Sequence, residues 1–199
     1  MAFYLMDVYL RVANDVPQPV GRGRAIAYLN EVLPPIWVAN YPSTGGEILT
    51  VTLGGQPGEN GAVSTMFDLQ PKRSKNDDRV VAVWGLSKTE PASTRNTNRM
   101  AGFLGGAWAA VHSARDRGHF YAHTMGGGTD NNLFPQLASV NRGGEWRRME
   151  RYAAENPGTF CFIRPIYRDS SWVPSQIEYG IYKLPPAEAF RFWGNLFRN

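Results

Sequence analysis

The chain has 199 residues, a formal net charge of +4 and a pI near 9.3, which suits one large domain or two small ones. With 43% hydrophobic and 19% charged residues, the composition excludes a disordered or fibrous chain. No stretch approaches the ~18 unbroken apolar residues of a membrane span, and the first residues lack the pattern of a classical signal peptide. We therefore expect no membrane insertion. The single cysteine, Cys161, excludes an internal disulfide framework and a thiolate zinc site.

The basic residues comprise 17 arginines and 4 lysines. Guanidinium groups suit bidentate contacts with phosphate, so this bias is compatible with a nucleic-acid ligand. A GC-rich genome, which favours arginine codons, is the alternative explanation, because a net charge of +4 is modest. Charge alone therefore leaves the partner open.

In the N-terminal part, residues 3–12 are apolar enough for a strand or a short helix. Apolar residues on one side of residues 22–32 predict a second short helix, which should stop before Pro34 and Pro35. Runs rich in Val, Thr and Ile then alternate with clusters of Gly, Pro, Asn and Asp, a pattern typical of an antiparallel meander. The three strands are expected at residues 47–53, 62–69 and 79–86.

Residues 88–99 are polar and contain Pro91, which favours a linker or a long surface loop. We therefore divide the chain into residues 1–99, an N-terminal α+β region of unknown role that could belong to the same domain, and residues 100–199. The overall class is α+β with an antiparallel sheet. The second part is expected to contain a helix at 100–114, a short strand at 118–123, an irregular stretch at 132–140, a helix at 144–156, strands at 159–167 and 176–184, and an amphipathic helix at 186–197 with Phe190, Trp193 and Phe197 inward.

Side chains suited to catalysis gather between residues 116 and 150. His119 can act as a base near neutral pH, and Arg117 beside it can hold a phosphate. The amide and carboxylate groups of Asn141 and Glu150 are hard oxygen ligands that suit Mg²⁺ better than zinc. Since no serine or cysteine nucleophile stands out, this set favours phosphodiester hydrolysis over acyl transfer.

Three motifs follow one another in this stretch: Asp-Arg-Gly-His at residues 116–119, Asn-Leu-Phe-Pro-Gln at 132–136, and Asn-Arg-Gly followed by Trp and Glu at 141–150. Together they resemble the DNA/RNA non-specific endonucleases of the ββα-metal (His-Me finger) superfamily. The resemblance covers roughly residues 112–184 and is closest to members found as bacterial toxin domains. It implies that residues 100–199 contain a strand–loop–helix finger as the nuclease core.

The resemblance also implies a one-metal mechanism. His119 would be the general base, and Arg117 would support the phosphate and the charge of the transition state. Asn141 would be the direct protein ligand of one Mg²⁺, for which Mn²⁺ can substitute, and Glu150 would orient water around the metal. Because the bases take little part, cleavage should depend weakly on sequence.

The spacing between the last two residues departs from the family. The asparagine and the glutamate are usually about eight residues apart, whereas Asn141 and Glu150 are nine apart, which places them on opposite faces of a regular helix. A helix that begins only after Gly143 and Gly144 removes the conflict. Glu145 is the alternative to Glu150 at the metal.

Several residues have a structural reading beside the functional one. We expect His123 to be a buried histidine that is either structural or supports the catalytic groups from behind, Asp116 to brace the finger and Asn132 to fix a loop through the backbone. Asn141 could cap a helix instead of binding metal. Four arginines could form either a solvated helix face or DNA contacts: Arg142, Arg147, Arg148 and Arg151.

The function expected from the sequence is a Mg²⁺-dependent, sequence-tolerant endonuclease that acts on DNA, with RNA as a further substrate. A folded nuclease is hazardous to its own cell, so we expect an effector held in the cytoplasm of the producing cell, neutralised by an immunity protein and delivered by a specialised secretion or injection apparatus. The alternative is a non-catalytic nucleic-acid-binding or assembly protein that retains the finger as a scaffold.

Overall fold

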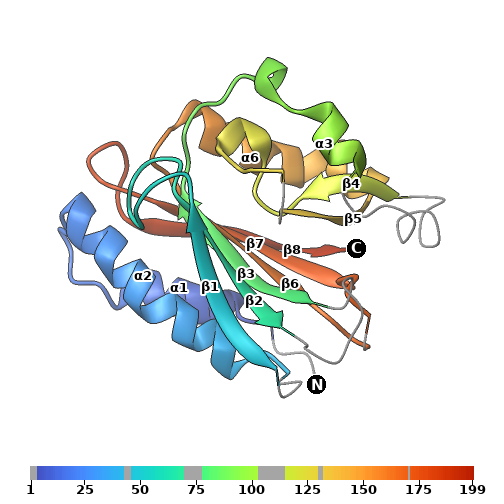
Figure 1. The fold of residues 1–199 in the computed structure, drawn as a ribbon. Coiled ribbons are helices and arrows are strands. Elements are labelled where there is room, and N and C mark those ends of the chain that lie inside the picture. The colour runs from blue at the N-terminus through green and yellow to red at the C-terminus, as the bar shows by residue number, and fades with distance from the viewer. Residues whose placement is uncertain (1–3, 43–45, 70–77, 103–114, 130–131, 170) are drawn as a thin grey trace.

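A computed structural model describes residues 4–42, 46–69, 78–102, 115–129, 132–169 and 171–199. Its centre is a six-stranded sheet in the order β1-β2-β3-β6-β7-β8, whose neighbouring strands run antiparallel. A separate two-stranded sheet pairs β4 with β5. The elements form three layers, with α1 and α2 on one face of the large sheet and β4, β5 and α6 on the other (Figure 1). The expected α+β class with a mainly antiparallel sheet is confirmed.

The motif residues singled out in the sequence lie on β4, β5, α5 and α6, in the upper layer of Figure 1. The helices are α1 (Met6–Asn14), α2 (Arg22–Ala39), α3 (Thr97–Gly102), α5 (Ala138–Asn141) and α6 (Gly144–Glu155), with short 3-10 turns η1 (Ala92–Thr94) and η2 (His123–Met125). The strands are β1 (Glu47–Leu53), β2 (Val63–Leu69), β3 (Arg79–Leu86), β4 (Arg115–His119), β5 (Leu133–Leu137), β6 (Phe160–Ile166), β7 (Gln176–Lys183) and β8 (Arg191–Arg198). Within the described ranges, no helix is long and apolar enough to cross a membrane.

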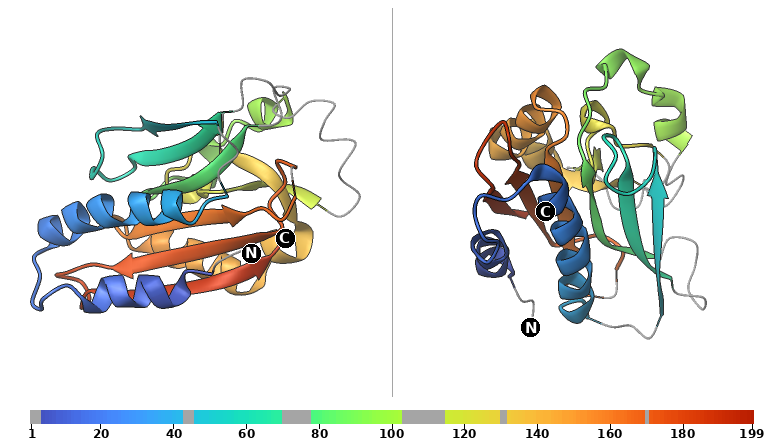
Figure 2. Two further views of the ribbon diagram at one scale, coloured as in Figure 1. Left: turned by 90° about the horizontal axis from the view of Figure 1, so that it is seen from below. Right: turned by 90° about the vertical axis from the view of Figure 1, so that its left-hand side faces the viewer.

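The central strands are apolar on both faces because both faces are covered. On β6, Phe160 and Phe162 pack in the cluster beneath α1 and α2, whereas Cys161 and Ile163 pack in the cluster beneath α6. This is the two-residue alternation of a strand, with both sets of side chains buried. Seen from below, α1 lies near β8 and α2 nearer the middle of the sheet (Figure 2). Burial raises the pKa of the Cys161 thiol, which is therefore inert.

The first two helices differ from the prediction in one important respect. Of the first stretch, residues 6–12 lie in α1, which runs from Met6 to Asn14, whereas α2 continues through Pro34 and Pro35 to Ala39, so the expected stop at the prolines is wrong. Each proline removes one backbone hydrogen bond from the helix. The helix persists because its fully buried stripe continues past the prolines at a spacing of one turn. This stripe comprises Ala25, Leu29, Leu33 and Trp37.

The C-terminal segment corrects another prediction. The strands expected at 159–167 and 176–184 are confirmed as β6 and β7, but residues 191–198 form strand β8 and not an amphipathic helix. β8 pairs with β7 along its whole length, from Arg191 opposite Lys183 to Arg198 opposite Gln176. Residues four apart, such as Trp193 and Phe197, share a face in a strand as well as in a helix, so their spacing does not distinguish the two structures.

Strands from both sides of the expected boundary at residues 99 and 100 belong to one sheet, since β3 pairs with β6. Residues 88–99 lie along η2 and α6, with the backbone N–H of Lys88 bonded to Met125 and the Thr89 hydroxyl bonded to Ala154. The helix expected at 100–114 falls mostly outside the described residues, and α3 ends at Gly102. The segment expected to be a linker therefore packs against the second part of the chain.

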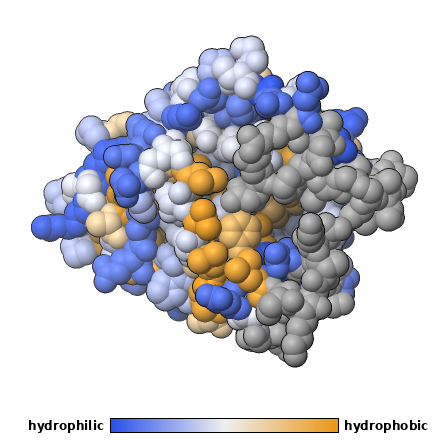
Figure 3. Space-filling model, in the orientation of Figure 1, coloured by the Kyte–Doolittle hydropathy of each residue, from blue (hydrophilic) through white to orange (hydrophobic). Residues whose placement is uncertain are grey.

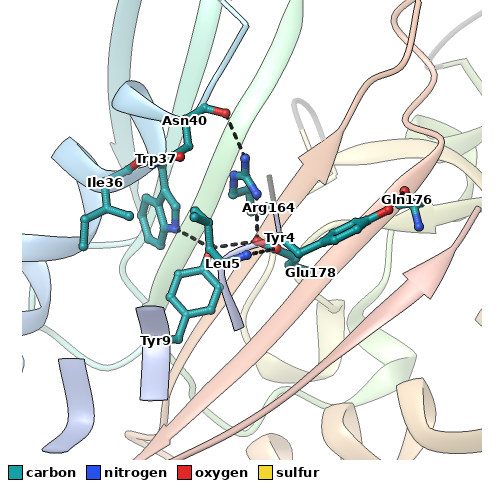
Figure 4. Close-up of polar contacts among 9 residues, drawn as sticks. All are labelled: Tyr4, Leu5, Tyr9, Ile36, Trp37, Asn40, Arg164, Gln176 and Glu178. Atoms are coloured by element: carbon teal, nitrogen blue, oxygen red, sulfur yellow. Dashed lines mark hydrogen bonds and ion pairs between the residues drawn. The ribbon is translucent and has the colours of Figure 1, made fainter. Parts of the chain in front are cut away.

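A buried polar network joins the N-terminal helices to the sheet (Figure 4). The Glu178 carboxylate on β7 is fully buried and accepts hydrogen bonds from the backbone N–H of Leu5 at 2.7 Å and the Tyr9 hydroxyl at 2.8 Å. It also pairs with Arg164 at 2.9 Å, and Arg164 donates to the carbonyl of Asn40. The charges thus compensate each other inside the protein, and residues before and after the expected boundary share one network.

The outer strand β1 is the least covered part of the sheet. Ile48, Leu49 and Leu53 are exposed by 37%, 42% and 49%. Apolar surface gathers over β1 on the face shown in Figure 3. Within the described residues β1 pairs with β2 alone, so the opposite edge of β1 is a site where an additional chain could pair.

Candidate active site

The motif residues lie on a hairpin followed by helices. β4 and β5 pair with Arg117 opposite Pro135 and His119 opposite Leu133, and β5 leads directly into α5. Residues 132–140 are therefore not the irregular stretch expected from their sequence. Pro135 lacks an N–H group, and it is tolerated because, in the part of the chain that the structure describes, β5 pairs with β4 alone.

The glycine of the Asp-Arg-Gly-His motif is required by packing. A Cβ atom on Gly118 would overlap the side chain of Gln136, which is fully buried on the neighbouring strand. Any larger residue would therefore push β4 and β5 apart. Gly118 thus lets Arg117 and His119 sit on a strand that lies tightly against its partner.

Asn132 holds the loop that follows His119. Its Oδ1 accepts a hydrogen bond from the N–H of Tyr121 at 2.7 Å, and its Nδ2 donates to the carbonyls of Tyr121 and Gly128 at 2.6 and 2.8 Å. The side chain is 3% exposed, so these bonds are shielded from water. The expected role of Asn132 in fixing the loop is confirmed.

All four predicted site residues line one cavity of about 340 Å³. β4 supplies Arg117 and His119, the end of α5 supplies Asn141, and the second turn of α6 supplies Glu150. The fold therefore brings together residues that are far apart in the sequence. The remaining lining residues are Arg95, Ala122, His123, Arg142 and Arg147.

His119 has the environment of a neutral base. Its side chain is buried, and Nε2 has no hydrogen-bond partner among the described residues. Burial, with smaller contributions from the charges of Arg95 and His123, lowers the pKa of His119 to about 3. The imidazole is therefore uncharged near neutral pH, and one ring nitrogen remains available to a molecule that enters the cavity.

His123 is tied down by a hydrogen bond. It lies in η2, is 9% exposed, and its Nε2 lies 2.9 Å from the hydroxyl of Thr94. β4 ends at His119, so the two histidines do not share a strand face. The expected burial of His123 is confirmed, and the residue also lines the cavity.

Asn141 is oriented by Asp116. Its Nδ2 donates to Oδ2 of Asp116 at 3.0 Å, and its Oδ1 makes no hydrogen bond to the described residues. Arg142 donates to the same carboxylate through Nε and Nη2 at 2.8 and 2.6 Å. The bonds from Arg142 and Asn141 lower the pKa of Asp116, which stays ionised and accepts only. Asp116 is thus the brace that the sequence predicts.

The spacing conflict between Asn141 and Glu150 is resolved by the glycines between them. α5 ends at Asn141, Gly143 is extended, and Gly144 has a φ of +62°, which favours glycine. The chain therefore turns before the regular part of α6, and Glu150 faces the same cavity as Asn141. α6 thus begins at Gly144, one residue earlier than the start expected after both glycines.

Glu150 is 5% exposed and accepts hydrogen bonds from Trp146 Nε1 at 2.9 Å and Arg147 Nη1 at 2.7 Å. Burial raises the pKa of Glu150, an effect opposed by the charge of Arg147. Glu145 lies elsewhere, where it accepts a hydrogen bond from Trp193 and forms an ion pair with Arg148. Of the two glutamates, only Glu150 lines the cavity.

Arg95 lines the cavity, although nothing in the sequence marked it. It comes from the polar stretch expected to be a linker, and its Nε is buried without a hydrogen-bond partner among the described residues. Arg147 lines the cavity as well and was one of four helix arginines that the sequence could not tell apart. Arg95 could have been found only through the contacts of residues 88–99 with η2 and α6.

The donor set fits a metal that rests on few protein ligands. Among the described residues, no three His, Cys, Asp or Glu side chains lie close enough together to hold an ion. Asn141 and Glu150 both line the cavity, and the Nδ2 group of Asn141 is the end of its amide that Asp116 binds. Hard oxygen donors of this kind suit Mg²⁺ or Mn²⁺.

A sequence model of DNA/RNA non-specific endonucleases matches residues 73–183, which is more than half of the chain. The chain belongs to the DNA/RNA non-specific endonuclease family. The family resemblance expected from the three motifs is confirmed. The comparison with curated proteins found no match.

The family match extends further towards the N-terminus than the motifs do. It begins at residue 73 and includes β3 and residues 88–99, which form the wall beside the cavity. The endonuclease family consists of nucleic-acid hydrolases that generally depend on a divalent metal. The cavity described above lies entirely within the matched residues.

Proposed function

We propose that this endonuclease hydrolyses phosphodiester bonds in DNA, and also in RNA, using one Mg²⁺ ion and His119 as the general base. The observation that carries the proposal is the buried Nε2 of His119, which has no hydrogen-bond partner among the described residues and lies in the same cavity as Asn141, Glu150 and four arginines. A neutral acceptor surrounded by cations suits the activation of water beside a phosphate.

The metal would rest on Oδ1 of Asn141, and Mn²⁺ would replace Mg²⁺. When bound, it supplies a Lewis acid that polarises the phosphate and stabilises the leaving oxygen. Asp116 keeps the Asn141 amide turned so that Oδ1 faces away from the carboxylate. Glu150 would orient water beside the metal, with its own position set by Trp146 and Arg147.

The protein residues divide the remaining work. His119 removes a proton from the attacking water through Nε2, and its low pKa keeps that nitrogen unprotonated at neutral pH. Arg117 and Arg95 line the cavity and bind the non-bridging phosphate oxygens, where negative charge grows in the transition state. All of these groups act on phosphate and water instead of on bases, so cleavage is sequence-tolerant.

We infer that β4, β5 and the following helical segment form the ββα finger of the superfamily. The pairing of β4 with β5 and the direct passage into α5 and α6 support this assignment. Gly143 and Gly144 interrupt the helical part, so the metal ligand and Glu150 come from two helices instead of one.

We also propose that the enzyme acts as an antibacterial or cytotoxic effector, held in check by an immunity protein and delivered by a secretion or injection apparatus. The resemblance of the motifs to toxin-domain nucleases supports this role. The lone cysteine is buried and makes no disulfide, so the fold does not depend on an oxidising compartment. Growth arrest on expression in bacteria, abolished by His119→Ala, is the expected result.

The deciding experiment is digestion of supercoiled plasmid and of structured RNA with Mg²⁺ and with EDTA. The wild-type protein should convert plasmid to nicked and linear forms only with the metal, and His119→Ala should leave it supercoiled. The alternative function, a nucleic-acid-binding protein without catalysis, predicts retarded but intact plasmid in both buffers. Intact plasmid and intact RNA with Mg²⁺ would reject the nuclease proposal.

A further inference from the structure

A second hollow, of about 580 Å³, lies on the other side of α6 from His119. Its walls come from α6 and from the strands β7 and β8, and they combine cations with aromatic rings. Arg148, Arg151 and Arg191 are exposed there, and Tyr152 and Trp193 are half-buried. We call this hollow the Trp193 pocket.

The Trp193 pocket is connected to the active-site cavity. A third hollow, of about 710 Å³, shares Arg95, Arg147 and Glu150 with the active-site cavity. At its other end it shares Arg151 and Glu155 with the Trp193 pocket. The three hollows therefore follow one another around α6, with arginines along the whole path.

The rings of the Trp193 pocket are already arranged around cations. The Arg148 guanidinium lies 5.2 Å from the centre of the Trp193 ring, and the Lys183 ammonium lies 4.3 Å from the Tyr152 ring. The two rings meet edge to face at 5.5 Å. Flat aromatic and guanidinium groups beside positive charge are the features on which unpaired nucleotide bases stack.

The basic residues of the Trp193 pocket differ in whether they form ion pairs. Glu145 pairs with Arg148, and Glu188 pairs with both Lys183 and Arg191. Arg151 has no ion pair or hydrogen bond within the described residues and stands where the Trp193 pocket meets the middle hollow. It is the residue best placed to bind a phosphate between the two ends of the path.

We propose that a single strand of the nucleic-acid substrate runs from the active-site cavity across α6 into the Trp193 pocket, where Arg151 and Arg191 bind its phosphates and an unpaired base stacks on Trp193. The proposal rests on the proposed nuclease function and adds a substrate class, because a base can stack on Trp193 only when it is free of its duplex. Single strands and locally unpaired duplexes are then the preferred substrates.

Binding is tested in the His119→Ala background with EDTA, so that cleavage does not interfere. The probes are a labelled single-stranded DNA of 20 nucleotides and the corresponding 20-base-pair duplex, titrated over a range of salt. Arg151→Gln with Arg191→Gln should weaken single-strand binding about fivefold and reduce the slope of log Kd against log salt by about 1.4. The matched control is Arg11→Gln with Arg24→Gln, which removes two exposed arginines from α1 and α2 and should change neither quantity.

Stacking is tested with two substitutions of Trp193. Trp193→Ala should weaken single-strand binding about tenfold and leave duplex binding unchanged, whereas Trp193→Phe, which keeps a flat ring, should bind within about twofold of the parent. Circular dichroism and thermal unfolding establish that each variant is folded. If Trp193→Ala fails to fold, the double variant of Arg151 and Arg191 and the variant Trp193→Phe still test the proposed strand path.

Two results would overturn the proposal. One is that the double variant of Arg151 and Arg191 binds the single strand as tightly as the control variant of Arg11 and Arg24 does. The other is an equal loss of single-strand and duplex binding in Trp193→Ala, which would leave a charged surface without base stacking.

Cleavage assays separate this inference from the nuclease proposal. With Mg²⁺, the arginine pair should raise KM for a long single strand about fivefold at unchanged kcat, and should hydrolyse bis(p-nitrophenyl) phosphate, which is too small to span the path, like the wild type. If the wild type cleaves neither substrate, the nuclease function fails while the binding data still decide the path. If the double variant loses activity equally on the long single strand and on bis(p-nitrophenyl) phosphate, the Trp193 pocket is not a separate part of the site and the inference is wrong.

Discussion

Asp116 fixes the orientation of the Asn141 side-chain amide. The carboxylate can only accept hydrogen bonds, so the Nδ2 group of Asn141 must face it, at 3.0 Å, and Oδ1 must face away. Asp116 comes from β4 and Asn141 from the end of α5. One hydrogen bond therefore links the strand that carries His119 to the residue proposed to hold the metal.

Replacing Asp116 by alanine should weaken metal binding by releasing the Asn141 amide. We expect Asp116→Ala to raise the Mg²⁺ concentration needed for half-maximal cleavage about 10- to 100-fold, with activity recovering at high Mg²⁺. Arg142→Gln is the matched control, because it removes the partner on the exposed side of Asp116 and leaves the bond to Asn141 in place. A metal titration that is unchanged in Asp116→Ala would contradict the orienting role.

The acid side of the pH profile should reflect the low pKa of His119. An unperturbed histidine base would lose about tenfold in kcat/KM per pH unit below about 6.5. Because burial lowers the pKa of His119 to about 3, the neutral base persists and kcat/KM should stay level from pH 8 to about 5. Glu150→Gln serves as control, since burial raises the pKa of that carboxyl group and it could add an acid limb of its own. A limb near pH 6.5 that persists in Glu150→Gln would show that His119 titrates normally.

Glu178 should be essential for stability but not for catalysis. Glu178→Gln leaves Arg164 buried at 4% exposure without its carboxylate, and loss of one partner of a buried pair costs about 3 to 5 kcal/mol. The free energy of unfolding, measured by urea denaturation, should fall by that amount. Glu90→Gln, at a partly exposed ion pair with Lys88, should leave the free energy of unfolding nearly unchanged.

The same measurement tests whether the two parts of the chain unfold as one unit. The sheet contains strands from both sides of residues 99 and 100, and Glu178 binds the backbone of Leu5. Loss of helix, loss of tertiary packing and loss of cleavage should therefore coincide in wild type and in Glu178→Gln. Two separate transitions, or rapid proteolytic cutting within residues 88–99 that releases a folded fragment, would indicate independent domains.

Much of the architecture followed from local pattern. The meander of β1 to β3, the strands β6 and β7 and the helix α6 were predictable because alternation, turn residues and the stop at Asn156 agreed. The exceptions were decided by tertiary contacts. α2 passes its two prolines because Trp37 is fully buried, and β8 is a strand because β7 offers it an edge along its whole length.

The candidate site divides in the same way. His119, Arg117, Asn141 and Glu150 were identifiable because the motifs keep them in a fixed order, and the fold places all four on one cavity. Arg95 could not be found, since its position depends on how residues 88–99 lie against η2 and α6. The pairing of Asn141 with Asp116 was hidden for the same reason, because it joins two elements across 25 residues.

The central claim is that Nε2 of His119 removes the proton from the attacking water. The most direct measurement is the single-turnover rate of phosphodiester cleavage by His119→Ala with saturating Mg²⁺, with and without added imidazole, beside the control His123→Gln. We predict a loss of about 10²- to 10⁴-fold in His119→Ala, partial recovery in proportion to neutral imidazole, and a rate close to wild type in His123→Gln. Cleavage by His119→Ala at the wild-type rate would contradict the claim.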